Sequence, residues 1–327
     1  MIERLHVEHF KSIRNLDLDT SKINLFIGEP NTGKSNILEA LGLISWVAHS
    51  HKYKIQDFIR LRYIQNLFYD NDVSRDIIVQ ATDGEVNPGI IFGFRDNQYH
   101  VNLGDPAKPA NGLLLNTDEI IKNNIKEDNN YKFLKFYRYD FQPNTKIGES
   151  SYLLPPRGDN MSTLVFSDKN LRRLILPFFK NYGFNLVVKQ DEQRIEYQKM
   201  VDDIVYSYPM ELLSDTLLRI IFHTLAMETN SDSTIIMEEP ESHSFPYYTK
   251  YLGERIAKDN SNQFFIATHN PYLLTSIMEK SKEEEVSVFV TSYVDYETRV
   301  KRLNSGEKKE ILEYDPFLNL QDFIDEA

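Results

Sequence analysis

Three short apolar runs along the chain predict β-strands that are buried on both faces. Residues 23–27, 234–237 and 264–267 are mostly apolar, and each run ends in polar or turn-forming residues. Such bounded runs are typical of strands inside a layered sheet. After the first run, apolar residues recur at helical spacing, so this part of the chain predicts a strand, a loop and a helix.

Other stretches add an antiparallel sheet and another helix. Residues 75–104 alternate polar and apolar positions around Asp-Gly and Asn-Pro-Gly turns, and residues 285–303 predict two more short strands. A helix is predicted behind Ser214 or Asp215 as N-cap. Its apolar positions are Leu217, Leu218, Ile221, Phe222 and Leu225. The 178 residues between Ser35 and Ser214 lack sustained heptads, which excludes a long coiled-coil arm.

Composition limits the class of protein. The 327 residues are 41% hydrophobic and 26% charged, which suffices for one large core or two smaller ones. The longest apolar runs fall short of the ~20 residues of a membrane span, and no export signal is visible, so we expect a cytoplasmic protein without membrane contact. The absence of cysteine excludes disulfides and thiolate metal sites. A net charge of −12 disfavours a broadly basic surface but permits a local patch for nucleic acid.

The loop after the first strand predicts a nucleotide site. It is "GEPNTGKS", a complete G-x-x-x-x-G-K-[ST] pattern between a strand and a helix. Glycines let backbone N–H groups surround a phosphate, the helix N-terminus adds its dipole, Lys34 reaches the β and γ phosphates, and Ser35 can hold Mg²⁺. The residues predicted to bind ATP are Gly28, Asn31, Thr32, Gly33, Lys34, Ser35 and Asn36.

A P-loop protein needs carboxylates at the end of a second strand, for the metal and for the attacking water. In "TIIMEEPES", Glu238 would hold Mg²⁺ or its water shell, and Glu239 would polarise the water. The alternative is a solvated acidic loop after a core strand, which fits Glu241 better. His269 follows the third strand, at a position where open α/β sheets bind ligands. Taken without the other motifs, this histidine would be expected to have a structural role.

Together these segments resemble the ABC-type ATPase heads of SMC proteins, RecF mediators and overcoming-lysogenisation-defect nucleases. They are most similar to the compact "AAA family ATPase" group whose acidic motif reads E-E-P-E. The resemblance implies an α/β fold: a P-loop NTPase of the ABC-ATPase head type, with a mixed sheet, helices and an intervening mixed lobe. It makes "IIMEEPE" the Walker B strand with Glu239 as catalytic base, and "ATHNP" the loop of the switch histidine, His269.

The resemblance also implies residues outside the P-loop that lie near a nucleotide. Ser214, in the signature-like "LLSDTLLR", would face the γ phosphate of a partner subunit, and His243 would lie in a D-loop. Lys11 and Ser12 would lie near the nucleotide of their own subunit.

The sequence departs from the family pattern at several positions. Glu238 replaces the usual aspartate, Thr216 stands where the signature has glycine, and Phe245 replaces a D-loop histidine. Thr216 adds a Cβ that restricts the approach of the opposing phosphate. The Q-loop glutamine is not assigned, because the candidates Gln80, Gln56 and Gln65 compete.

Three regions are expected: residues 1–105 and 201–327 as the two lobes of the head, and 106–200 as the intervening lobe. That lobe contains "YKFLKFYRYDF" and "LRRLILPFFKNYGF", whose aromatic and basic residues either bind nucleic acid or pack as core aromatics with extended cations. The 58 residues after His269 are too few for the nuclease domain of the overcoming-lysogenisation-defect proteins. In the tail, Leu318, Leu320 and Phe323 either dock on a partner or pack on the chain's own sheet.

The resulting hypothesis is a Mg²⁺-dependent ATPase that forms a homodimer on ATP and controls a separate effector protein. DNA repair and anti-phage defence are the expected settings, with DNA as an open partner. The alternative is a nucleotide-dependent regulatory switch that holds a protein partner without touching DNA. A subunit of a membrane transporter fits less well, because transporters usually keep the glycine of the signature.

Overall fold

The computed structural model describes residues 1–50, 52–84, 87–104, 110–115, 131–140, 150–189, 191–192, 194–313, 317 and 320–324. A central six-stranded sheet has the order β15-β14-β3-β13-β12-β8. Its strands are β3 (Ile23–Gly28), β8 (Leu134–Tyr137), β12 (Thr234–Glu238), β13 (Gln263–Ala267), β14 (Val286–Val294) and β15 (Glu297–Arg302). All neighbours are parallel except β14 and β15. The predicted α/β class and the P-loop fold of an ABC-type head are confirmed.

The central strands are buried on both faces because successive side chains point to opposite sides of a strand. In β12, Ile235 and Met237 join one hydrophobic cluster and Ile236 joins the other. In β13, Phe264 and Phe265 divide in the same way. This arrangement explains why these strands appear in the sequence as continuous apolar runs.

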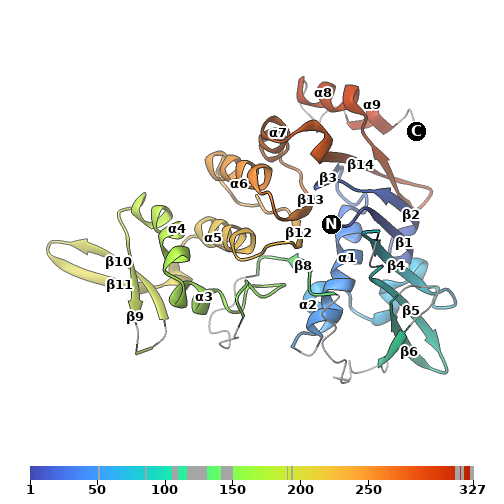
Figure 1. Cartoon of the computed structure of the whole chain (residues 1–327), viewed down its shortest axis with the longest axis horizontal. Coiled ribbons are helices and arrows are strands. Elements are labelled where there is room, and N and C mark those ends of the chain that lie inside the picture. The colour runs from blue at the N-terminus through green and yellow to red at the C-terminus, as the bar shows by residue number, and fades with distance from the viewer. Residues whose placement is uncertain are drawn as a thin grey trace.

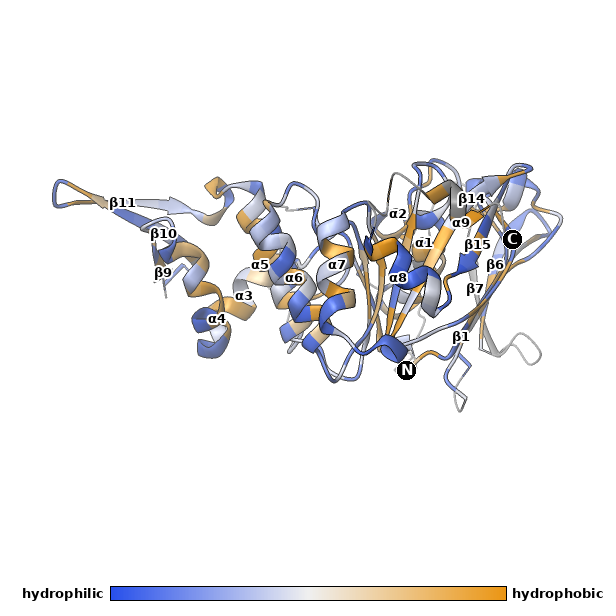
Figure 2. Cartoon of the chain, turned by 90° about the horizontal axis from the view of Figure 1, so that it is seen from above, coloured by the Kyte–Doolittle hydropathy of each residue, from blue (hydrophilic) through white to orange (hydrophobic). Residues whose placement is uncertain are grey.

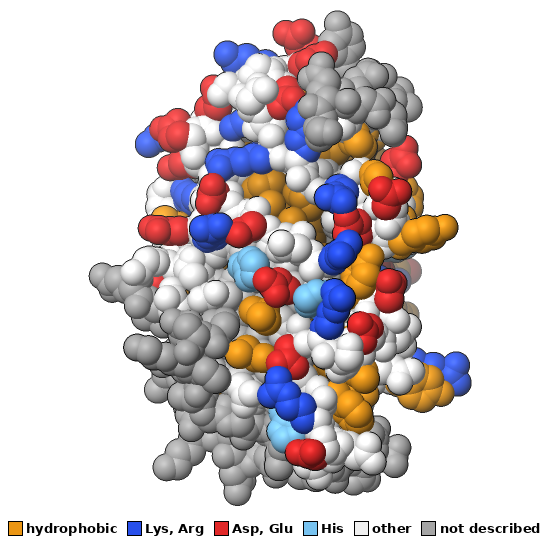
Figure 3. Space-filling model, turned by 90° about the vertical axis from the view of Figure 1, so that its right-hand side faces the viewer, with side chains coloured by type: hydrophobic (Ala, Val, Ile, Leu, Met, Phe, Trp, Pro, Cys, Tyr) orange, Lys and Arg blue, Asp and Glu red, His pale blue; other side chains and the backbone are white. Residues whose placement is uncertain are grey.

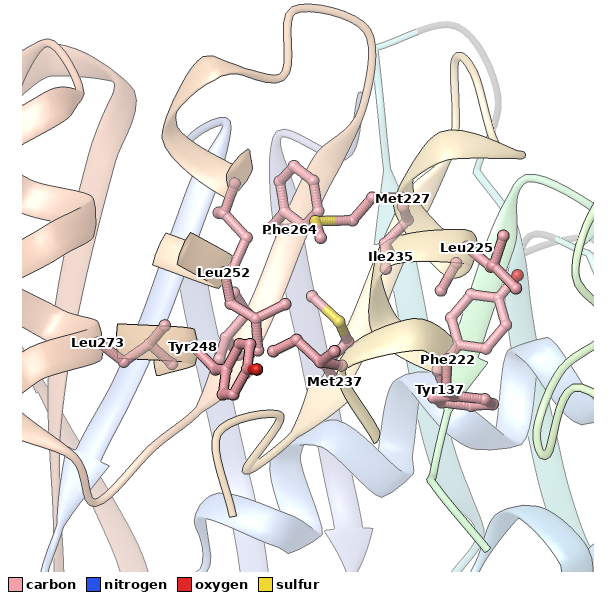
Figure 4. Close-up of a cluster of buried hydrophobic side chains, with 14 of the residues drawn as sticks. Tyr137, Phe222, Leu225, Met227, Ile235, Met237, Tyr248, Leu252, Phe264 and Leu273 are labelled. Atoms are coloured by element: carbon pink, nitrogen blue, oxygen red, sulfur yellow. The ribbon is translucent and has the colours of Figure 1, made fainter. Parts of the chain in front are cut away.

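Helices cover both faces of the central sheet. On one face lie α5 (Asp215–Glu228), α6 (Pro246–Lys258) and α7 (Pro271–Lys280). Figure 4 shows their side chains meeting the strands: Phe222, Leu225, Leu252 and Leu273 lie around Ile235, Met237 and Phe264. On the other face, α1 (Lys34–His49) separates the central sheet from a second sheet. The α1 helix follows β3 in the chain and begins at the carboxyl end of that strand.

The second sheet is antiparallel, with the order β2-β1-β4-β5-β6-β7. Its strands are β1 (Arg4–Phe10), β2 (Ile13–Asp19), β4 (Ile77–Thr82), β5 (Gly89–Arg95), β6 (Gln98–Leu103) and β7 (Ala110–Leu115). The antiparallel strands predicted in residues 75–104 are thus present. Short helical turns follow α1: α2 (Ile55–Phe58), η1 (Ile64–Leu67) and η2 (Tyr69–Asn71). Among the described residues, no helix is long and apolar enough to cross a membrane.

Part of the middle of the chain forms an arm that projects from the body (Figures 1 and 2). It contains α3 (Met161–Ser167), α4 (Lys169–Lys180), η4 (Met210–Leu212) and a sheet of β9 (Asn185–Lys189), β10 (Arg194–Val201) and β11 (Ile204–Pro209). The region 106–200 is therefore not one lobe, because β7 extends the antiparallel sheet and β8 pairs with β12. Strand pairing over such distances leaves no local trace in the sequence.

The aromatic and basic segments of the middle pack largely as core. Leu134, Phe136 and Tyr137 of β8 are fully buried. The described part of the second segment, helix α4, buries Leu171, Ile175, Phe178 and Phe179. Both observations favour core packing over a stacking surface for nucleic acid.

The end of the chain packs on the body. The last elements are η5 (Glu283–Glu285), α8 (Ser305–Glu313) and α9 (Leu320–Ile324). Leu320 and Phe323 are buried in the same cluster as Ile235, so they pack against their own chain. Leu318 lies outside the described residues.

Candidate nucleotide site

The loop from Gly28 to Ser35 connects β3 to α1 and requires its two glycines. Gly33 is the N-cap of α1 with φ of 97°, and a Cβ there would lie 1.9 Å from Oγ1 of Thr298. A Cβ on Gly28 would lie 2.3 Å from Oγ1 of Thr291. The loop therefore runs tightly along β14 and β15, with the N–H groups of the first helical turn at its inner side.

Lys34 is folded back over this loop. Its ammonium donates to the carbonyl oxygens of Gly28 at 2.8 Å and Glu29 at 2.7 Å. Burial lowers the pKa of Lys34 to about 8, although Glu239 and Glu238 act in the opposite sense. The side chain thus places a buried cation inside the loop, held only by neutral carbonyls that an anion can displace.

The remaining loop residues differ in their surroundings. Thr32 donates to the carbonyl of Glu29 at 2.9 Å and shares a 2.6 Å hydrogen bond with Thr291. Asn31 is exposed and has φ of 65°, and Ser35 lies half-buried in the first turn of α1. Its hydroxyl is therefore available at the helix N-terminus.

Ser12 and Lys11, predicted to lie near the nucleotide, have different surroundings. Asn36 donates to the Ser12 hydroxyl at 2.7 Å, which lies 2.6 Å from the hydroxyl of Thr298. Ser12 thus touches the first turn of α1. Lys11 is directed to the buried carboxylate of Glu39 and donates to the carbonyl of residue 60 at 2.7 Å. Its ammonium therefore belongs to a charge network beneath the loop.

Glu238, the last residue of β12, belongs to the same charge network. Its Oε1 accepts from Nη2 of Arg60 at 2.9 Å, and its Oε2 accepts from Nη2 of Arg138 at 3.2 Å. Both guanidiniums also donate to Oε1 of Glu39, at 2.9 and 2.8 Å. Burial alone raises the pKa of Glu39, but Lys11, Arg138 and Arg60 outweigh it and hold that pKa below its ordinary value. Glu39 and Glu238 therefore share the two guanidiniums.

Glu239 lies one residue beyond β12 and faces His269. It has φ of 44°, and its Oε1 lies 3.4 Å from Nε2 of His269. Its Oε2 accepts from the Ser242 hydroxyl at 2.9 Å. Burial and the charge of Lys34 lower the pKa of His269, although Glu239 opposes them, so the imidazole is neutral at pH 7. A half-exposed carboxylate and a neutral imidazole thus lie side by side.

Glu241 is not the solvated acid that the sequence predicted. It is only 5% exposed, and one of its oxygens accepts from the Thr268 hydroxyl. Its Oε2 is buried without a hydrogen-bond partner among the described residues. Burial raises the pKa of Glu241 to about 7. The prediction was wrong because the loop after β13 covers this residue, and that loop is 27 positions away in the chain.

The signature-like segment lies at the N-terminus of α5. Ser214 is the exposed N-cap and accepts from the N–H of Leu217 at 3.4 Å. Thr216, which replaces the usual glycine, donates to the carbonyl of His243 at 2.7 Å. The signature-like segment and the D-loop-like segment are therefore joined within one chain.

Four large apolar side chains at the starts of three helices are exposed, and together we call them the edge patch. They precede or begin α5, α6 and α7, and their exposed fractions exceed one half. The edge patch consists of Leu212 (63%), Phe245 (70%), Tyr247 (64%) and Tyr272 (58%). Large exposed apolar side chains such as these offer area that a partner in an assembly can cover.

The arginines of this site were not predicted from the sequence. None of the glutamines considered for the Q-loop lies in the network described above: Gln80 lies within the antiparallel sheet, and Gln56 and Gln65 are exposed. Arg60 belongs to an irregular loop without a motif. Arg138 directly follows an apolar run that forms β8, and a basic residue at a strand end was the available signal.

The residues present fit a magnesium ion that is bound together with a triphosphate. Mg²⁺ takes few ligands from the protein beside phosphates and water, so Ser35 and one carboxylate suffice. Glu238, the last residue of β12, would supply that carboxylate. In the part of the chain that the structure describes, no group of three His, Asp or Glu residues forms a site for a metal alone.

Comparisons with known proteins identify the family of the chain. The family model described as "AAA domain, putative AbiEii toxin, Type IV TA system" matches residues 23–275. The DNA replication and repair protein RecF of Streptococcus suis is 30% identical over 112 residues, 34% of this chain and 29% of that protein. An uncharacterized protein of Methanocaldococcus jannaschii is 33% identical over 94 residues, 24% of this chain and 41% of that protein. These matches span less than half of either relative.

A solved structure supports the fold. The crystal structure of an SMC head bound to the C-winged helix domain of ScpA has a TM-score of 0.53 with this chain at 16% identity. The similarity covers 94% of this chain and 99% of that one.

Proposed function

Because the chain belongs to the family of AAA domains described as putative AbiEii toxins of type IV toxin–antitoxin systems, we propose that it binds and hydrolyses ATP as an ABC-type head. One observation carries the proposal. The ends of three adjacent parallel strands, β3, β13 and β12, bring the P-loop, His269 and the pair Glu238 and Glu239 to one edge of the sheet. This edge is where open α/β sheets bind ligands.

The residues act on the triphosphate in distinct ways. The N–H groups of the P-loop and the α1 dipole attract the phosphates, and Lys34 exchanges its two carbonyl partners for β and γ phosphate oxygens. Magnesium, held by Ser35 and Glu238 when bound, neutralises phosphate charge. Glu239 accepts a proton from water as the water oxygen bonds to the γ phosphorus and the bond to ADP breaks. His269 donates a hydrogen bond to the γ phosphate.

Two substitutions test this proposal. Lys34→Ala removes the cation of the P-loop and should abolish binding of Mg-ATP in calorimetry. Glu239→Gln keeps the shape but loses the basic oxygen, so ATP should bind and hydrolyse at least ~100-fold more slowly in a phosphate-release assay. Lys258→Ala and Glu254→Gln, which change an ion pair on α6, are the matched controls. Normal ATP affinity in Lys34→Ala would refute the site, and normal turnover in Glu239→Gln would move the base elsewhere.

We propose further that two heads close on ATP and thereby control an effector protein. Ser214 and the D-loop-like segment have no nucleotide in their own subunit to meet, and the edge patch offers apolar area for a second copy. The family description names a putative toxin system, and the name of RecF refers to DNA replication and repair. These names support an effector in DNA repair or in a toxin–antitoxin system, and anti-phage defence is the further setting that we propose.

A second candidate, a switch that holds a protein without touching DNA, is favoured by the projecting arm. The tip of the β10–β11 hairpin exposes apolar residues around the acidic turn Asp202-Asp203. They are Met200, Val201, Ile204, Val205 and Tyr206. An acidic tip repels phosphates, whereas an apolar groove in a protein can receive it.

The surface charge is consistent with this second candidate. Figure 3 shows that Lys and Arg alternate with Asp and Glu among the described side chains of the face beside the antiparallel sheet. ATP-dependent DNA binding that weakens steeply with salt would favour the first candidate. Its absence at low salt would favour the second.

A further inference from the structure

Arg138 reaches the proposed metal ligand from a strand that no recognised motif includes. It follows β8, which pairs in parallel with β12 on the side away from β13 and β3. Its backbone N–H donates to the carbonyl of Pro156 at 2.9 Å, and its guanidinium lies 5.1 Å from the ring centre of Phe136. The side chain is 22% exposed. Arg138 is thus held at the same sheet edge as the P-loop and Glu238.

The charges around Arg138 do not balance among the groups of the network. Lys11, Arg60 and Arg138 supply three cations, while Glu39 and Glu238 supply two carboxylates. Glu39 is fully buried and is contacted by all three cations, so it remains paired in any state. Glu238 is the carboxylate that belongs both to this charge network and to the proposed nucleotide site. Among the described groups of this network, the surplus of positive charge favours an added anion.

Binding of a metal must change the contacts of Glu238. Both of its oxygens now accept from guanidiniums, and a carboxylate that turns toward magnesium or its water gives up at least one of them. Arg138 then keeps only Glu39, which it shares with Lys11 and Arg60, so the guanidinium can take up another anion in place of Glu238. The γ phosphate is the anion that arrives with the metal.

We propose that Arg138 binds the γ phosphate, exchanging Glu238 for phosphate oxygens when Mg-ATP enters. The inference rests on the proposed function and adds a residue that distinguishes ATP from ADP. Arg138 is chosen over Arg60 because it extends from a strand end of the central sheet. Arg60 is 58% exposed, and its backbone N–H is also bound to Glu39.

The test compares ATP with ADP in calorimetry on full-length Arg138→Gln. Loss of a charge-assisted contact to the γ phosphate should weaken ATP binding about 10- to 100-fold while ADP affinity stays unchanged. Arg138→Lys keeps the charge and should recover part of the ATP affinity. Arg255→Gln is the matched control: this arginine is 28% exposed, paired with Glu228, and lies in the last turn of α6, away from the loops.

The outcomes separate this inference from the proposed function. If the unmodified chain does not bind ATP, both are overturned. If it binds ATP and Arg138→Gln loses affinity for both nucleotides equally or for neither, this inference alone is overturned. A thermal melt of each variant shows whether an equal loss of affinity for ATP and ADP is caused by unfolding. An equal loss with that cause also counts against a contact specific to the γ phosphate.

Discussion

At the scale of single residues, three glutamates in one short segment have three different environments. Glu238 is paired with two arginines, Glu239 is half-exposed beside His269, and Glu241 is buried with one unpaired oxygen. Their side chains are chemically identical, so their distinct functions must come from their surroundings. Because this oxygen is buried without a partner, the protonation of Glu241 affects the stability of the fold.

We predict that stability depends on pH through Glu241. Its folded pKa of about 7 lies above the ordinary value of 4.5, so between these pH values the folded chain binds more protons than the unfolded chain. The free energy of unfolding from this group therefore falls as pH rises through that window, by at most ~1.4 kcal/mol per pH unit.

Glu241→Gln removes this titration and keeps the hydrogen bond from Thr268. Denaturant melts at pH 5 and pH 8 should show the variant gaining about 1–3 kcal/mol over the unmodified chain at the higher pH. Glu254→Gln, at an exposed position on α6, is the control. An identical pH dependence in Glu241→Gln and the unmodified chain would contradict the assignment.

At the scale of elements, α5 connects packing to the proposed contact with a second subunit. Its inner face, including Phe222 and Leu225, packs on the central sheet. Its N-terminus presents Ser214 to solvent and is tied through Thr216 to the loop after β12. The inner face of the helix packs on the sheet along its length. A substitution at the exposed N-cap can therefore be made without altering this packing.

Two substitutions at Ser214 separate the cap from the contact. Ser214→Ala removes the cap and should lower the free energy of unfolding by about 1 kcal/mol. Ser214→Asp keeps an N-cap oxygen, so its stability should match that of the unmodified chain, whereas its charge would repel a phosphate. Urea melts measure both variants. Equal stability of Ser214→Ala and the unmodified chain would show that the cap contributes nothing.

At the scale of the whole molecule, the two halves of the proposed ATP site lie on separate loops of one chain. The P-loop begins α1 on one face of the central sheet, and Ser214 begins α5 on the other. A second copy can supply Ser214 to the nucleotide of the first, and the edge patch would then be covered. Closure of a symmetric dimer would bury two such patches at once.

We therefore predict that ATP produces a dimer when hydrolysis is blocked. Light scattering of Glu239→Gln with Mg-ATP should give twice the monomer mass, and addition of Ser214→Asp to this variant should return it to the monomer. Ser214→Asp preserves the cap. A monomer in the double variant would therefore reflect loss of the contact between subunits and not unfolding. A monomer in Glu239→Gln itself would refute dimerisation, and a dimer in the double variant would exclude Ser214 from the contact.

The sequence alone determined the strands of the central sheet and the chemistry at their ends. Continuous apolar runs predicted β3, β12 and β13 because buried parallel strands need apolar residues on both faces. The P-loop pattern predicted a tight turn before α1 because its glycines can adopt the left-handed backbone that Gly33 shows, with φ of 97°. These features depend on neighbouring residues, so local patterns suffice to predict them.

Only the tertiary structure decided which distant groups meet. Glu39, Arg60, Arg138 and Glu238 lie up to 199 positions apart in the chain, yet they form one network because β8 pairs with β12 and α1 packs beneath both. The burial of Glu241 under the loop of Thr268 has the same origin. Strand order and loop cover are set by the packing of the whole core, and a charged residue carries no local sign of the partner that it will find.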